Sequence, residues 1–167
     1  MPDGLTHLLT GYIFLQKWLK PGPLFLFLTG GLMPDILLRG GRVLFLGHPQ
    51  EDFFEMYLAP LHTPMGSLFV CIAIAQFFQS KIRRKVFSLL YLGCFAHFIL
   101  DFFQRTIAGI GYRTEVMDNY HWLYPISWYD FQFGLFWPEN APYALIALVP
   151  IAGWIFMKKL KSRERRG

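Results

Sequence analysis

Four long apolar segments, separated by polar or aromatic stretches, dominate the pattern along this chain of 167 residues. They cover approximately residues 24–38, 65–79, 86–104 and 141–157. With their flanks, these segments have the length of roughly 17 to 25 residues that a helix needs to cross a bilayer. A shorter apolar stretch, residues 4–19, precedes them. The pattern predicts an all-α fold, a polytopic membrane helical bundle with four to five transmembrane helices, formed by one domain over residues 1–167.

Capping residues and prolines predict where the first two helices begin and end. Asp3 can cap a first helix that Pro21 stops, and Pro23 opens the second helix. Pro34 should kink or end this second helix beside Asp35, because the residue before a proline disfavours helical backbone. The first helix is short, so it either spans a thinned bilayer or lies partly in the interface.

The later helices have similar signals. Thr63 is a good N-cap and Pro64 a good first helical residue, so a third helix is expected from there to about Gln79. The basic sequence SKIRRK then precedes the central helix, and Pro142 helps to open the last one. Two long loops are expected, at residues 39–61 and 105–140.

Two ionisable residues interrupt the most continuous apolar segment, residues 86–104. His97 and Asp101 are four positions apart, so on a helix they lie on the same face. An ionisable residue within a membrane helix is costly and marks a functional site by default. An imidazole and a carboxylate one turn apart are half of a metal site. The simpler alternative is that Asp101 pairs with Arg105.

The basic residues are distributed asymmetrically along the predicted topology. With five spans, one side of the membrane receives twelve of the sixteen lysines and arginines, including every lysine, and the other side receives four arginines. Basic residues collect on the cytoplasmic side. The basic tail, residues 158–167, is therefore expected in the cytoplasm and the N-terminus outside. No basic region precedes the first apolar stretch, so an integral protein of the plasma (inner) membrane without a cleaved signal peptide is expected.

This topology places five ionisable residues in one layer near the outer face. Three imidazoles and two carboxylates suit Zn²⁺ or another divalent metal. The predicted orientation depends only on the basic residues and not on any histidine. That the three histidines fall in one layer with the two aspartates is therefore independent support for a metal site. Each residue also has a simpler alternative, such as exposure, a bond to backbone, or pairing of Asp35 with Arg39. The five residues are His7, Asp35, His62, His97 and Asp101.

The order of five short motifs resembles a known membrane family. THLLTGY, LMPDILL, LHTPMGS, FAHFILDFF and LYPISW, which extend from His7 to Trp128, are similar to motifs of the LexA-regulated, membrane-bound, metal-dependent hydrolases. That family is similar in its His/Asp pattern to zinc-dependent phospholipase C and the single-strand-specific zinc nucleases. The resemblance implies metal-ligand roles for the same five residues. This chain lacks a second helical His-x-x-x-Glu/Asp pair, so one or two ions are expected instead of three.

The function expected from these features is hydrolysis of a phosphoester in a lipid-like substrate at the outer leaflet. The metal would lower the pKa of a bound water to about 7. Asp35 and Asp101 are the candidate catalytic carboxylates: Asp35 would orient the water, and Asp101 would bridge the ions if two are bound. Arg105 and Arg113 are candidates for binding the phosphate, because arginine offers a planar fork of donors. The alternative for both arginines is pairing with nearby acids.

The long loop between the last two helices is rich in aromatic residues, notably at residues 120–137. His121 in this loop is a possible extra ligand, whereas His48 is expected to be solvated. Tyrosine and tryptophan collect at membrane–water interfaces, so the loop is either an anchoring belt or a lipid-facing lid that includes Trp128. The lid is the favoured hypothesis because the loop follows directly from the helix that carries His97.

Two other function classes remain open. A non-enzymatic haem or redox subunit would use membrane histidines as axial ligands, but it leaves the two aspartates unexplained. A small ion or proton carrier would string its ionisable groups across the membrane. The net charge of +5 is explained by topology, so no nucleic-acid binding is expected. The two cysteines, Cys71 and Cys94, are expected to be buried as small hydrophobes. No sequence feature specifies an oligomeric state.

Overall fold

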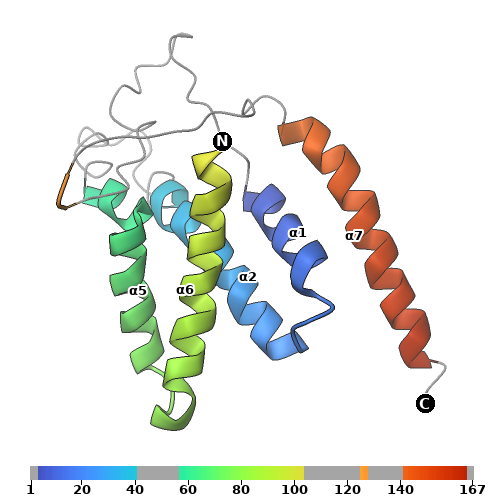
Figure 1. Ribbon diagram of the computed structural model, residues 1–167, viewed down its shortest axis with the longest axis horizontal. Helices are drawn as coiled ribbons and strands as arrows, with labels where there is room; N and C mark the ends of the chain where they lie inside the picture. Colours follow the sequence, from blue (N-terminus) through green and yellow to red (C-terminus); the bar gives the residue numbers. More distant parts are fainter. Residues whose placement is uncertain (1–3, 41–56, 104–124, 128–140, 165–167) are drawn as a thin grey trace.

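The computed structural model describes residues 4–40, 57–103, 125–127 and 141–164, and these are mainly helical (Figure 1). A π-helical turn, η1 (Ile36–Gly40), continues the second helix, and a 3₁₀ turn, η2 (Ala59–His62), precedes the third. The predicted all-α class is confirmed for these residues. The α-helices are α1 (Gly4–Leu15), α2 (Pro21–Asp35), α5 (Pro64–Gln76), α6 (Ser80–Phe102) and α7 (Ala141–Glu164).

Several helix ends differ from the predicted ones. α1 ends at Leu15, four residues early, and α2 begins at Pro21 instead of Pro23. Proline is tolerated in the first turn of a helix, where its missing N–H would have no intrahelical partner. Pro34 lies inside the last turn of α2, and the chain continues as the wider turn η1. Proline removes an intrahelical hydrogen bond, so a local departure from α-helical geometry at this point is reasonable.

The start of α6 corrects the prediction for the basic sequence SKIRRK. These residues form the first turns of α6, which begins at Ser80, and are not a separate connection. Lysine and arginine are good helix formers, so the helix extends beyond its apolar segment. By contrast, the start of α5 is confirmed. Thr63 has extended backbone, its Oγ1 accepts a hydrogen bond from the Gly66 N–H at 3.0 Å, and Pro64 is the first helical residue.

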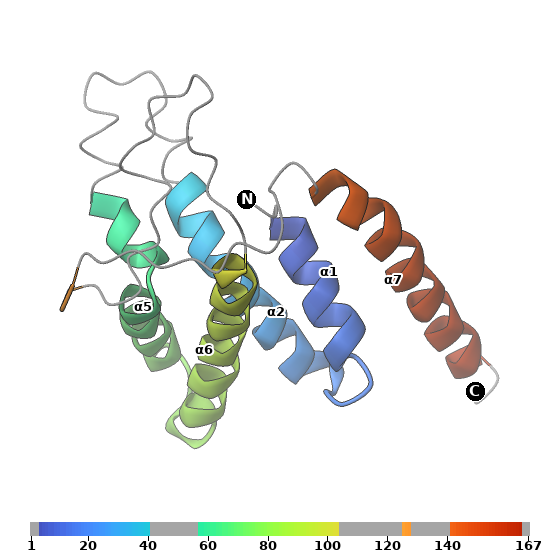
Figure 2. The same cartoon turned by 45° about the horizontal axis from the view of Figure 1, so that its top comes forward.

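The helices lie side by side in the order α5, α6, α2, α1, α7 (Figures 1 and 2). The closest packing is between α2 and α6. A Cβ atom at Gly30 would overlap the backbone of Leu90, and one at Gly93 would overlap the backbone of Phe27. Small residues allow helix backbones to approach in this way. The glycines therefore allow the second half of α2 to pack directly against the middle of α6.

A core of apolar side chains fills the space between α2, α5 and α6. It includes Met33, Leu90 and Phe98, together with the two cysteines. Cys71 and Cys94 are both fully buried and unbridged, with 3.7 Å between their sulfur atoms. Their predicted burial as small hydrophobes is therefore confirmed.

Three helical segments are long and apolar enough to cross a membrane: Pro21–Leu38, Ser80–Phe102 and Tyr143–Ser162. α1 and α5 are apolar but shorter, with 12 and 13 residues. At 1.5 Å per residue these two helices are roughly 18 to 20 Å long, less than the hydrocarbon core of about 30 Å. By length and composition, three helices in the described part of the chain could therefore cross a membrane, whereas four to five spans were predicted.

Candidate metal centre

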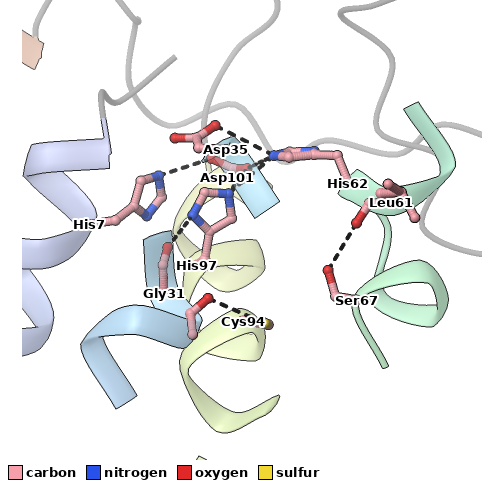
Figure 3. A network of polar contacts seen from close by, with 10 residues as sticks. His7, Gly31, Asp35, Leu61, His62, Ser67, Cys94, His97 and Asp101 are labelled. Carbon is pink, nitrogen blue, oxygen red and sulfur yellow. Dashed lines mark hydrogen bonds and ion pairs between the residues drawn. The ribbon is translucent and has the colours of Figure 1, made fainter. Parts of the chain in front are cut away.

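Five buried side chains lie together at one end of the helices (Figure 3). They come from four different parts of the fold: the first turns of α1, the end of α2, the end of η2, and the last turns of α6. All five residues that the sequence singles out as ligand candidates are therefore brought together. They are His7, Asp35, His62, His97 and Asp101, with exposures between 1% and 7%.

The α6 pair forms the centre of this cluster. His97 Nε2 lies 3.1 Å from Asp101 Oδ2, as the four-residue spacing on a helix predicts. Asp101 also contacts two further histidines. Its Oδ1 lies 3.3 Å from His7 Nε2, and its Oδ2 lies 3.6 Å from His62 Nε2. One carboxylate is thus shared by three imidazoles.

A backbone carbonyl fixes the orientation of His97. Its Nδ1 lies 2.9 Å from the carbonyl oxygen of Gly31 in α2 (Figure 3). A carbonyl can only accept a hydrogen bond, so Nδ1 carries the proton that it donates. In a neutral ring the lone pair is then on Nε2, which faces the cluster. Metal-bound histidines commonly donate their other N–H in this way.

His62 is positioned by the turn that leads into α5. Its Nε2 lies 3.2 Å from His97 Nε2 and 3.7 Å from Asp35 Oδ1. Two bonds brace the backbone around it. Thr63 Oγ1 donates to the carbonyl of Pro60 at 2.7 Å, and Ser67 Oγ donates to the carbonyl of Leu61 at 3.1 Å. The imidazole is therefore held by the same cap that starts the helix.

Removal of this cap should affect both stability and metal binding. Thr63→Ala is expected to cost about 1 kcal/mol of unfolding free energy, the usual value of an N-cap. It should also weaken metal binding, because His62 is the neighbouring residue. Thermal unfolding and metal titration of the purified protein measure the two effects. Thr63→Ser keeps the hydroxyl and is the matched control. If the alanine and serine variants bind metal equally well, the cap does not position His62.

His7 completes the cluster from α1. Its ring stacks on that of His97, with centroids 4.0 Å apart and an interplanar angle of 28°. Its Nδ1 is buried and has no hydrogen-bond partner among the described residues. An imidazole with an unpartnered nitrogen in a buried layer is destabilising unless something else binds there. His7 Nε2, which faces Asp101, is also buried without a hydrogen-bond partner in the described part of the chain, and a metal ion bound by Nε2 would offset the cost at that nitrogen.

The interatomic spacing can be compared with that of a real metal site. Two nitrogen ligands at 2.0–2.1 Å from a tetrahedral zinc lie about 3.3 Å apart. The distance between His62 Nε2 and His97 Nε2 is 3.2 Å, and the histidine–Asp101 distances are 3.1, 3.3 and 3.6 Å. Within each of two overlapping groups of three side chains, the ligand atoms lie within 4.8 Å of one another, so each group could hold one small ion.

The charges point to the same conclusion. Buried carboxylates need compensating positive charge. Imidazolium side chains could supply it, and so could a divalent cation held beside the carboxylates of Asp35 and Asp101. Two overlapping groups could hold such an ion: His7, His97 and Asp101, and Asp35, His62 and His97.

Some contacts were not expected from the sequence. The Gly31 carbonyl that holds His97 and the Ser67 hydroxyl that holds the Leu61 carbonyl were both missed. Ser67 lies four residues after the N-cap Thr63, on the same side of the helix start. That spacing could have indicated that its hydroxyl reaches back to the turn before α5. Several predicted site residues lie outside the described residues: Arg105, Arg113, His121 and Trp128.

Comparisons with known proteins give no relative: no protein-family model, curated protein or solved structure matches the chain.

Proposed function

We propose that this protein is a membrane-embedded, metal-dependent hydrolase that cleaves a phosphoester of a lipid-like substrate. The observation that carries the proposal is the convergence of three histidines and two aspartates at ligand spacing, buried at one end of an apolar helical bundle. The proposed cofactor is Zn²⁺, one or two ions, or another divalent metal. The motif resemblance to LexA-regulated, membrane-bound hydrolases favours the same chemistry.

The five cluster residues have distinct roles in this proposal. His7, His97 and Asp101 would hold one ion, and Asp35, His62 and His97 form the overlapping group that would hold the same ion or a second one. A divalent ion held there supplies a Lewis acid and lowers the pKa of bound water. Asp35, at the edge of the cluster beside His62, is the candidate to orient the attacking water and accept its proton. Arg105 and Arg113 remain the candidates for binding the phosphate.

The membrane location is supported by the exposed surface. Many large apolar side chains point outward, among them Phe25, Phe69 and Trp154, each more than 60% exposed. Only 6% of the apolar segment of α7 is buried. Such extended apolar surface on a water-soluble monomer would be unusual. In the proposed bundle of four to five transmembrane helices, these side chains contact lipid.

The orientation follows from the basic residues. We propose that the C-terminal tail is cytoplasmic in the plasma (inner) membrane and that the metal site faces the outer leaflet. Cysteine variants at Ser162 and Glu115, treated with a membrane-impermeant reagent in intact cells, should label only at position 115. Labelling of both positions from the same side would contradict the five-span topology. The two buried native cysteines can be replaced beforehand to remove background.

Hydrolysis can be tested directly with purified protein in vesicles. Turnover of a phospholipid should require a divalent metal, disappear with a chelator, and return when Zn²⁺ is added back. A short soluble phosphodiester is the second substrate. Comparison of the two shows whether hydrolysis depends on the lipid part of the substrate. Protein that binds metal but hydrolyses neither substrate would contradict the proposal.

The two alternatives fit the cluster less well. A membrane haem with two axial histidines holds them on opposite faces of the macrocycle. Here the His7 and His97 rings stack on one another, and carboxylates share the space. An ion or proton carrier would need ionisable groups at several depths, whereas these five side chains share one end of the helices. A visible absorption spectrum with a Soret band would favour the haem alternative.

A further inference from the structure

An apolar groove begins at the metal-ligand cluster. It has a volume of about 330 Å³ and lies between α1 and α6. These two helices contact each other little, but both pack on α2, which also contributes to the lining. His7 and His97 line the groove, so it is continuous with the cluster. Phe14, Phe27 and Leu28 also line it, farther from the cluster.

The groove runs toward the middle of the helices. On α1 it is lined from His7 to Phe14, seven residues that span roughly 10 Å at 1.5 Å per residue. On α6 it extends from His97 back to Gly93, in the same direction because the two helices are antiparallel (Figure 1). In the proposed membrane this direction leads from the headgroup layer into the hydrocarbon core.

The lining is polar at the end next to the cluster and apolar along the rest of the groove. Among the described residues that line it, Thr10 is the only polar side chain apart from the two histidines. Small residues, including Ala96, leave the space open. At its rim Phe14 is 70% exposed and Ile99 is 43% exposed, so the groove opens on the outer surface of the helices. A molecule could therefore reach the cluster sideways from the lipid phase.

We propose that this groove binds one acyl chain of the lipid substrate, with the polar end of the lipid at His7 and His97. The inference rests on the proposed function and names its substrate class. An amphiphile matches the groove because imidazoles and carboxylates lie at one end and hydrocarbon side chains line the rest. A small soluble phosphoester would leave the apolar part unfilled.

A photoreactive phospholipid tests chain binding without depending on activity. The probe is a phosphatidylglycerol with a diazirine near the end of one acyl chain, mixed into vesicles that contain the metal-loaded protein. Crosslinks are expected on α1 and α6 at residues that line the groove. Ala96→Phe should fill the groove and lower crosslinking there at least tenfold. Ala73→Phe, at an exposed position of α5, is the matched control and should leave it unchanged.

Two results would overturn the inference. Crosslinks spread equally over the outer surfaces of α5 and α7 would mean that lipid contacts the helices without a preferred groove. Equal crosslinking in the Ala96→Phe and Ala73→Phe proteins would mean the same. If the Ala96→Phe protein does not fold, Ala96→Leu is the second variant. It adds less volume and should also lower crosslinking in the groove, but by a smaller factor.

Turnover separates this inference from the proposed function. Ala96→Phe should lower kcat/KM for the phospholipid at least tenfold while metal content and kcat/KM for a short soluble phosphodiester stay normal. If the wild-type protein hydrolyses nothing but crosslinks in the groove, the hydrolase proposal fails and the chain site stands. If the variant slows both substrates equally, or neither, the groove proposal fails and the hydrolase stands.

Discussion

Replacement of His97 or Asp101 by alanine is expected to lower the metal content of the purified protein at least tenfold. His97 belongs to both groups that could hold an ion. Asp101 contacts three histidines at 3.1, 3.3 and 3.6 Å, so its loss leaves them without the shared carboxylate. Removal of a ligand should cost more than the 10- to 100-fold typical of a group that only supports a ligand. Elemental analysis after purification without chelator measures the effect.

Two variants control for general disruption. Cys71→Ala changes a fully buried core residue outside the cluster, and His48→Ala removes a histidine predicted to be solvated. Both proteins should keep wild-type metal content. His7→Ala and His62→Ala should lower the metal content less than His97→Ala does, because each of them belongs to only one group and His97 belongs to both. Full metal occupancy in the His97→Ala protein would mean that α6 has no special role in binding.

The cluster could be predicted from the sequence because the helix directions expected from the hydrophobic pattern place all five ligand candidates at the same end of the helices. The four-residue spacing sets the His97–Asp101 pair, and the Thr63–Pro64 signal sets where His62 stands. The direction of each helix then places the ligand candidates at the same end. The spacing of apolar residues, the helix-capping residues and the uneven distribution of basic residues are enough to predict that these side chains lie at the same end. No tertiary contact is needed for that prediction.

The details of the cluster depend on tertiary packing, which the sequence pattern does not encode. His7 and His97 are 90 positions apart, and their stacking requires α1 and α6 to flank α2 at one particular depth. The bond from His97 to the Gly31 carbonyl depends on how closely α2 approaches α6. The π-helical turn after Asp35 also has no clear signal beyond Pro34. The roles of Arg105, Arg113, His121 and Trp128 stay predictions.

Gly30→Ala is expected to be strongly destabilising, although the change adds only one methyl group. In an open helix interior the same change stabilises by about 1 kcal/mol, because alanine is the better helix former. At Gly30 the new Cβ would overlap the carbonyl of Leu90, which belongs to the backbone of α6 and cannot rotate away. α2 and α6 must then separate, at a cost of about 3 kcal/mol for an overpacked core.

The same separation should weaken metal binding. Gly31, the next residue, holds His97 through a 2.9 Å hydrogen bond, which would lengthen as the helices move apart. Gly153→Ala in α7 is the matched control, because a Cβ there meets nothing within 4 Å and the change should be neutral or slightly stabilising. Thermal unfolding in detergent and metal titration measure both effects. Equal stability of the two variants would show that α2 and α6 tolerate a wider spacing, and His97 would then need another support.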